Sequence, residues 1–177
     1  VWGKSWGSIG IGKLREVALI KPEIEYEENE LWHKEPDFFL LRYTQKIDGD
    51  LLQRNHEEYA ALLESLGIKI YWMEFEDKMG AWGPMRKLFM AEEPKIVKGG
   101  AIIPRFGHGS YKRGLEREFQ KFFSKIGCPI LYSVHGTGIC EIAPMTIPIA
   151  EGVFLAAKSC AYNDEGLNQA LPVLYRS

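Results

Sequence analysis

The strongest constraint on the fold is the order in which helical and strand patterns alternate along the chain. An amphipathic helical pattern over 50–66 ends at a glycine, and an alternating strand pattern over 68–75 follows at once. The same order recurs where a helical pattern over 113–126 ends at a glycine and a strand pattern covers 128–134. Glycine ends a helix readily because it adopts a positive φ without strain. Helices that alternate with strands predict an α/β fold.

Further strand patterns precede these helices. Residues 14–20 alternate and are rich enough in β-branched side chains for a strand, and residues 94–103 form two short strand patterns that meet at Gly99–Gly100. Another strand pair is predicted over 147–156, and a last helix over 165–174. The recurring order of strand pair, helix and strand suits small ββαβ modules.

Composition agrees with one folded domain over residues 1–177. The chain is 46% hydrophobic and 26% charged, with a net charge of −2, and at this length roughly 70% of the unfolded surface can be buried. No run approaches the ~18 apolar residues that a membrane span needs, and residues 1–6 lack an apolar signal-peptide core. We therefore expect a cytoplasmic protein with no membrane partner.

Charge is unevenly distributed. Seven acids lie between Lys21 and Asp37, interrupted by prolines, which predicts a solvated loop. Residues 84–125 carry ten Lys or Arg against four Glu, and such a stretch favours an anionic partner. Half of these cations stand at helical spacing beside glutamates, so the pattern favours a solvated helix face over a nucleic-acid site.

Five motifs carry a resemblance to a known superfamily. They are Phe89-Met90-Ala91-Glu92-Glu93-Pro94, Gly99 to Arg105, Arg113-x-x-Glu116, Gly138-x-x-Glu141 and Asn163-x-Glu165-Gly166-Leu167-x-Gln169. Together they resemble the guanidino-group-modifying superfamily, which includes dimethylarginine dimethylaminohydrolases, arginine and agmatine deiminases and amidinotransferases. The pattern from Asp50 through His56 to Gly67 resembles that family's first helix. The resemblance implies an α/β propeller (pentein-like) of five ββαβ modules, of which about three are present here.

A guanidinium group offers its donors in a planar fork that a carboxylate meets with two hydrogen bonds. Glu92 and Glu93 follow an apolar run and precede a strand, as a partly buried acid pair would. In the resemblance, Glu93 takes the place of an aspartate that grips the substrate guanidinium. The alternative is two exposed glutamates at the entrance of a strand.

Four more residues are implied to bind substrate. Arg113 matches a family arginine that receives a substrate carboxylate, although a surface ion pair with Glu116 is an alternative. His108 lies in a glycine loop where the family has a mobile segment, and a solvent-exposed imidazole is its alternative. Glu141 and Asn163 lie in the matched segments that hold substrate in the family.

The chain departs from the family in those same segments. The family's E-G-G-D is Glu141-Ile142-Ala143-Pro144 here, and its R-T-N is Ala161-Tyr162-Asn163, so a carboxylate is missing at Pro144 and an arginine at Ala161. The family's usual amino-acid substrates are therefore in question, and a tail met by Tyr162 is one alternative.

No catalytic residue is predicted within the chain. The family nucleophile is a late cysteine and its base a late His-x-Asp segment, and we expect both to lie beyond Ser177. Cys140 is interpreted as structural, because the neighbouring Glu141 would raise the pKa of its thiol. His135 is not taken as the base either, since the family's base lies later. The dispersed cysteines and histidines show no metal-ligand spacing, and no metal or other cofactor is predicted.

The resemblance implies an amidinohydrolase or amidinotransferase that acts on a small guanidino or amidino compound through a covalent cysteine mechanism. The chain alone is then not competent. The alternative is a non-catalytic binding or interaction protein on the same fold, because fold does not fix function. Exposed strand edges predict a homo-oligomer or association with a missing C-terminal portion.

Overall fold

The computed structural model describes residues 6–7, 12–22, 48–74, 94–107, 114–150, 153–156 and 161–176. Two compact units share the chain: Leu14–Ala91 forms one, and Val1–Lys13 with Glu92–Ser177 forms the other. Both units combine helices with strands, which confirms the predicted α/β class.

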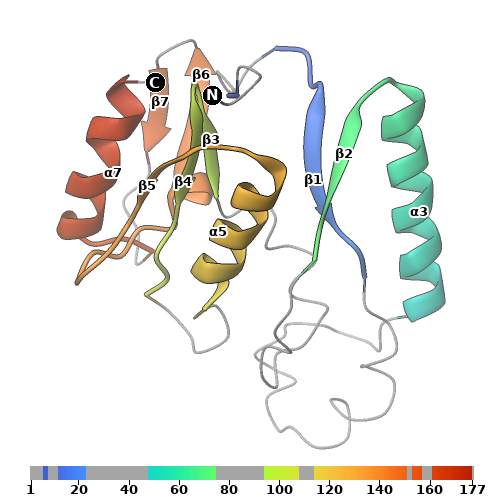
Figure 1. Cartoon of the computed structure of the whole chain (residues 1–177), viewed down its shortest axis with the longest axis horizontal. Helices are drawn as coiled ribbons and strands as arrows, with labels where there is room; N and C mark the ends of the chain where they lie inside the picture. Colours follow the sequence, from blue (N-terminus) through green and yellow to red (C-terminus); the bar gives the residue numbers. More distant parts are fainter. Residues whose placement is uncertain are drawn as a thin grey trace, which may run out of the picture. The chain divides into compact units, whose positions relative to one another are not determined.

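The unit Leu14–Ala91 holds two parallel strands joined by a helix. Strands β1 (Glu16–Ile20) and β2 (Lys69–Met73) pair residue by residue, and α3 (Gly49–Ser65) is the crossover between them (Figure 1). Parallel strands cannot be joined by a tight turn, so they need such a crossover. The start of α3 is fixed by Asp48, whose carboxylate accepts a hydrogen bond of 2.9 Å from the Leu51 amide.

The core of this unit lies between α3 and the strand pair. Its buried apolar side chains, each 7% exposed or less, are Ile20, Ala60, Leu63 and Met73. The helix predicted over 50–66 and the strand predicted over 68–75 are confirmed within two residues at each end.

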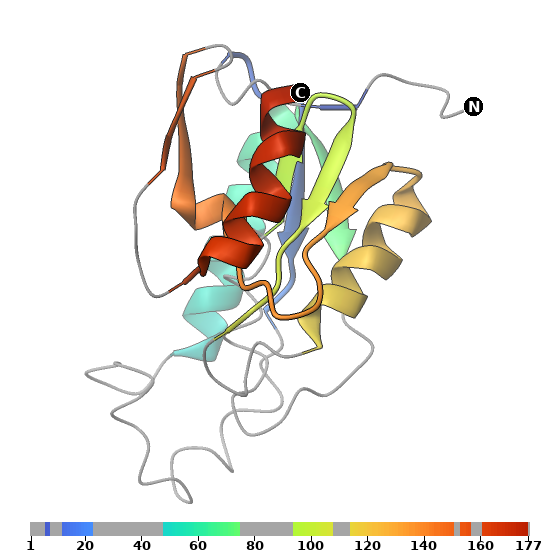
Figure 2. The ribbon, with the colours of Figure 1, turned by 90° about the vertical axis from the view of Figure 1, so that its left-hand side faces the viewer.

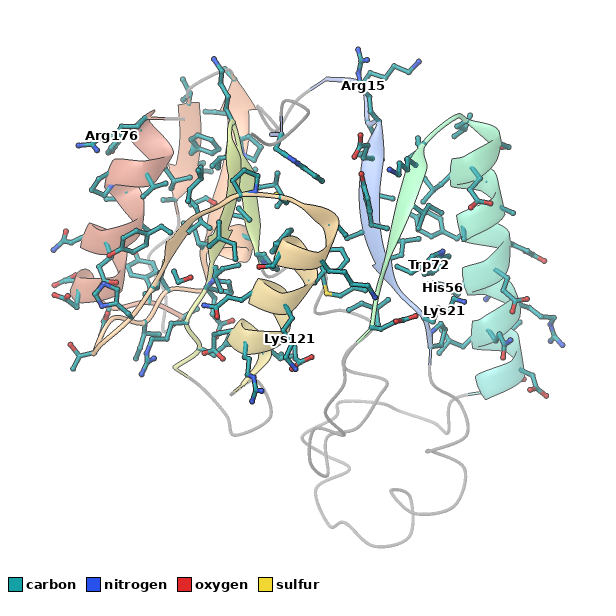
Figure 3. The ribbon with its side chains drawn as sticks, in the orientation of Figure 1. Arg15, Lys21, His56, Trp72, Lys121 and Arg176 are labelled. Atoms are coloured by element: carbon teal, nitrogen blue, oxygen red, sulfur yellow. The ribbon has the colours of Figure 1, made fainter. Side chains whose placement is uncertain are left out.

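His56 of α3 connects the helix to both strands (Figure 3). Its ring hydrogen-bonds to the backbone of Ile20 at the end of β1, and its centroid lies 5.8 Å from the Trp72 ring of β2. The Lys21 ammonium group lies 5.1 Å from the same Trp72 ring centroid. Burial lowers the pKa of His56 below its ordinary value of 6.5.

The other unit contains a complete ββαβ module. Strands β3 (Lys95–Val97) and β4 (Gly100–Ile103) form a hairpin, and α5 (Leu115–Ile126) leads to β5 (Ile130–Ser133), which pairs in parallel with β4. Gly99 has a φ of +101° at the hairpin turn, a conformation that favours glycine. The strand pair, helix and strand predicted from the sequence are thus confirmed.

Helices cover both faces of this three-stranded sheet. All four residues of β4 are buried. Ile102 packs in one cluster with Ala170 and Leu174 of α7 (Asp164–Arg176). The neighbours of Ile102 in β4 point the opposite way, toward α5, which contacts β4 and β5. Figure 1 shows the sheet between α7 and α5.

A second hairpin precedes α7. Strands β6 (Thr146–Ala150) and β7 (Val153–Ala156) pair antiparallel, as the sequence pattern over this stretch predicted. Lys95 of β3 attaches this hairpin to the sheet. Its ammonium group donates a 2.7 Å hydrogen bond to the Thr146 carbonyl and lies 5.4 Å from the Phe154 ring centroid.

The outer face of the hairpin is apolar and open. Ile147, Ile149, Val153 and Leu155 point to this face and are 47% to 60% exposed, and Ile147 lies directly opposite Leu155. Among the described residues, no strand pairs with the outer edge of β6 or β7 (Figure 2). Adjacent exposed apolar side chains of this kind are a feature of interaction surfaces.

Some predicted boundaries move. The first strand starts at Glu16 and not Leu14, and α5 starts at Leu115 because Gly114 takes a left-handed φ of +94°. The short helix α6 (Ile142–Met145) was not predicted. The fivefold propeller arrangement stays a prediction. No helix in the described part of the chain has the length and apolar character of a membrane span.

Candidate functional site

The structure describes two of the six residues predicted to bind substrate. Glu92, Glu93, His108 and Arg113 lie outside the described residues. Glu141 and Asn163 are described, and the structure brings their segments together beside the start of α7.

Glu141 is an acid with little access to water. It is 6% exposed and immediately precedes α6. Its amide donates a 3.0 Å hydrogen bond to the Ala161 carbonyl, while Cys140 and Arg105 exchange backbone hydrogen bonds of 3.0 and 3.1 Å on the other side. A buried carboxylate needs donors or a cation to offset its desolvation. Glu141 is therefore an acid held inside the protein, between the backbone pairs that its segment makes with Arg105 and Ala161.

Cys140, next to this acid, is not an activated nucleophile. Its side chain is 2% exposed. Burial raises the pKa of its thiol from 9.0 to about 11, and the charge of Glu141 contributes to the rise. The thiolate is the reactive form, so the raised pKa disfavours attack by this cysteine near neutral pH. The contribution of Glu141 agrees with the sequence-based expectation, and the structural role of Cys140 stays an interpretation.

The side chain of Asn163 makes hydrogen bonds to backbone groups of neighbouring segments. Its Oδ1 accepts hydrogen bonds from the amides of Ile139 (2.9 Å) and Gly166 (2.8 Å), and its Nδ2 donates one to the Thr137 carbonyl (2.8 Å). The Asn163 amide also donates to the Ile139 carbonyl at 3.0 Å. The residue thus caps α7 and binds the segment that leads to Glu141. Contact between Asn163 and substrate stays a prediction.

The start of α7 and this segment approach each other through two glycines. A Cβ built on Gly166 would collide with the backbone of Ile139, and one built on Gly138 would lie 3.1 Å from the Gly166 Cα. Only hydrogen atoms fit between the two backbones at these positions. The motif Gly138-x-x-Glu141 and the motif that begins at Asn163 therefore form one interlocked unit.

Gln169, one turn further along α7, holds the beginning of the same segment. Its Oε1 accepts from the His135 amide (3.0 Å), and its Nε2 donates to the His135 carbonyl (3.2 Å) and to Glu165 (2.9 Å). The His135 ring lies on an exposed loop with Nε2 3.1 Å from the Tyr132 hydroxyl oxygen. Sequence reasoning missed these roles of Gln169 and Tyr132.

Glu116 contacts the backbone on either side of the segment that contains His108 and Arg113. This carboxylate accepts hydrogen bonds from the amides of Gly114 (2.9 Å) and Phe106 (3.4 Å), one on each side of the segment. Backbone groups, which sequence reasoning did not consider, are thus the described partners of Glu116. On the same helix, Lys121 pairs with the buried Glu118 at 3.1 Å, as expected for cations at helical spacing beside glutamates.

Tyr162 is half-buried and packs against the cluster that includes Val134, Cys140 and Leu174. Contact between Tyr162 and a substrate tail stays a prediction. Within the described ranges, no group of three or more His, Cys, Asp or Glu gathers as metal ligands would.

Two comparisons with known proteins bear on this arrangement. The chain is 28% identical over its whole length to a 2-nitroimidazole nitrohydrolase from Mycobacterium sp. (strain JS330), and it spans 48% of that protein. Among solved structures it resembles a dimethylarginine dimethylaminohydrolase from Pseudomonas aeruginosa, a cysteine-to-serine variant complexed with citrulline, with a TM-score of 0.65 and 18% identity. That likeness covers 93% of this chain and 58% of the other.

No protein-family model matches the chain. The chain spans about half the length of the curated relative that it matches. The chain shares the α/β fold of dimethylarginine dimethylaminohydrolase, which agrees with the fold that its sequence motifs indicate.

Proposed function

We propose that this chain is the substrate-binding part of a hydrolase that acts on a planar carbon bonded to three nitrogens. The carbon of a guanidino group has this arrangement. So does C2 of 2-nitroimidazole, which is bonded to two ring nitrogens and to the nitro nitrogen. The two similar proteins are named for substrates of these two kinds. A single site that recognises this planar group of one carbon and three nitrogens, called CN3 below, would account for both likenesses.

The observation that carries the proposal is the buried carboxylate of Glu141 in the segment that matches the family's substrate-holding motif. A carboxylate can accept two parallel hydrogen bonds from a guanidinium, or one from a ring N–H, and Glu141 is 6% exposed. Glu92, Glu93, Arg113 and His108 remain proposed substrate contacts on the strength of the resemblance.

The proposed reaction is covalent. A cysteine thiolate attacks the CN3 carbon, and the leaving group departs with the electron pair of its bond, as a protonated amine or as nitrite. Water then adds to the same carbon and the thiolate is released. Cys140 is unsuited to the attack because its pKa is about 11. On the strength of the resemblance, in which the nucleophile is a late cysteine and the base a late His-x-Asp segment, we propose that both lie outside these 177 residues.

The substrate is proposed to lack an amino-acid tail. Where the family has an arginine, Ala161 has only a methyl group, and its carbonyl is occupied by the Glu141 amide. Proline stands in place of the family carboxylate. Neither end of a free amino acid would find a charged partner at these two positions.

Calorimetric titration of the chain with agmatine, 2-nitroimidazole and arginine tests this substrate class. We expect saturable binding of agmatine or 2-nitroimidazole and at least ~10-fold weaker binding of arginine. Equal, tight binding of arginine would contradict the proposed loss of tail recognition. The absence of binding for all three would refute the CN3 site.

A non-catalytic binding protein on the same fold remains a second candidate, favoured by the raised pKa of the Cys140 thiol. The coding sequence after Ser177 separates the two candidates. A His-x-Asp segment followed by a cysteine supports the hydrolase, and a stop codon supports the binding protein.

A further inference from the structure

The segment from Thr137 to Glu141 is attached on both sides by backbone hydrogen bonds. On one side Cys140 pairs with Arg105, and on the other Asn163 and Ala161 bond to Ile139 and Glu141. Asn163 adds three side-chain hydrogen bonds, two of them to this segment. A single amide thus contributes both a donor and an acceptor to a loop that lies more than 20 residues earlier in the sequence.

We propose that Asn163 is a positioning residue that fixes the buried carboxylate of Glu141 for substrate, an inference that rests on the proposed function. Asn163 acts through Ile139, two residues before Glu141, and through Thr137. It need not touch the substrate. Its place in the family-like motif is then explained by the loop that it holds.

The hydrogen bonds separate this role from plain helix capping. The cap of α7 is the bond from the Gly166 amide to Oδ1, and an aspartate can accept that bond equally well. The bond to the Thr137 carbonyl needs the Nδ2 donor. Asn163→Asp therefore keeps the cap and the acceptor for Ile139 but places two oxygens face to face at Thr137.

Cys140 provides a readout that needs no substrate. Its thiol pKa of about 11 depends first on burial and then on the charge of Glu141. A return to the ordinary 9.0 would raise the thiolate fraction at pH 8 about 100-fold. Cys128, also buried at 3% exposure, is an internal reference in the same unit.

The experiment measures iodoacetamide alkylation of Cys140 and Cys128 at pH 8 by mass spectrometry, together with the urea midpoint. We expect Asn163→Asp to speed the alkylation of Cys140 at least ~5-fold relative to Cys128. Asp48→Ala, which removes the cap of α3 in the other unit, is the matched control and should leave the Cys140 rate unchanged. A change below ~5-fold in Asn163→Asp overturns the proposal.

If Asn163→Asp does not fold cooperatively, Asn163→Ser is used with the same threshold, because serine keeps a capping oxygen but is too short to reach Thr137. Titration with agmatine then tests whether Asn163 acts on ligand binding through Glu141. Where the wild type binds agmatine, Asn163→Asp should raise Kd at least ~10-fold, and an unchanged Kd overturns the positioning role. If the wild type binds neither agmatine, 2-nitroimidazole nor arginine, the CN3 site fails, while the alkylation result still decides whether Asn163 fixes the segment.

Discussion

Replacing Gly166 by alanine tests how closely α7 approaches the segment that leads to Glu141. The test is whether the substitution raises or lowers the free energy of unfolding. Alanine is favoured over glycine inside helices by up to ~1 kcal/mol, so propensity alone predicts a more stable protein. In the folded chain the added Cβ would collide with backbone atoms of Ile139. Backbone held by hydrogen bonds on both sides cannot move aside cheaply, and overpacking of this kind costs about 1–3 kcal/mol or more.

The net expectation for Gly166→Ala is a loss of about 1–2 kcal/mol in the free energy of unfolding, because the collision outweighs the gain in propensity. Asn168→Ala is the control, since Asn168 is an exposed position of the same helix and should gain about 0.5 kcal/mol. Urea unfolding monitored by circular dichroism measures both variants in the transition that includes α7. A Gly166→Ala variant as stable as the wild type would refute the close approach of Gly166 to Ile139.

Three further outcomes are expected. The pKa of His56 is lowered by burial, so the unfolded chain binds a proton that the folded chain does not. The contribution of neutral His56 to the free energy of unfolding is then fully present above about pH 6.5 and is lost as the pH falls through the lowered pKa of the folded chain. Urea midpoints measured between about pH 7 and 5 should show this loss in the wild type and not in His56→Gln. Self-association through the apolar face of β6 and β7, proposed to be between two copies of this chain, should weaken in Leu155→Lys, and sedimentation that shows a dilute monomer in the wild type counts against it. For Glu93→Gln, agmatine affinity should fall by about 2–4 kcal/mol with little change in the urea midpoint, and an unchanged affinity removes Glu93 from the site.

The element order was predictable because its signals are local. A hydrophobic period of 3.6 followed by glycine identified α5, and the alternation after it identified β5. The hairpin of β3 and β4 followed from two glycines between short apolar runs. The start of α5 was less predictable, because Gly114 is a left-handed cap that periodicity does not reveal.

The site was harder to predict because its contacts join residues distant in sequence. Asn163 binds Ile139, and Gln169 binds His135 across 34 positions, and no local pattern specifies such pairs. A partial signal existed, since an asparagine immediately before a helical run is a typical N-cap. The requirement for Gly166 depends on how closely another backbone approaches it, which only the tertiary structure reveals.

The most direct test of the CN3 site is the affinity of the wild-type chain and of Glu141→Gln for agmatine, measured by titration calorimetry at pH 7.5. Glutamine preserves the volume but presents a donor toward a cation that has only donors. Losing one partner of a desolvated charged hydrogen bond costs about 2–4 kcal/mol, so the account predicts saturable wild-type binding that weakens at least ~30-fold in the variant. Equal affinity of the two proteins for agmatine would contradict it.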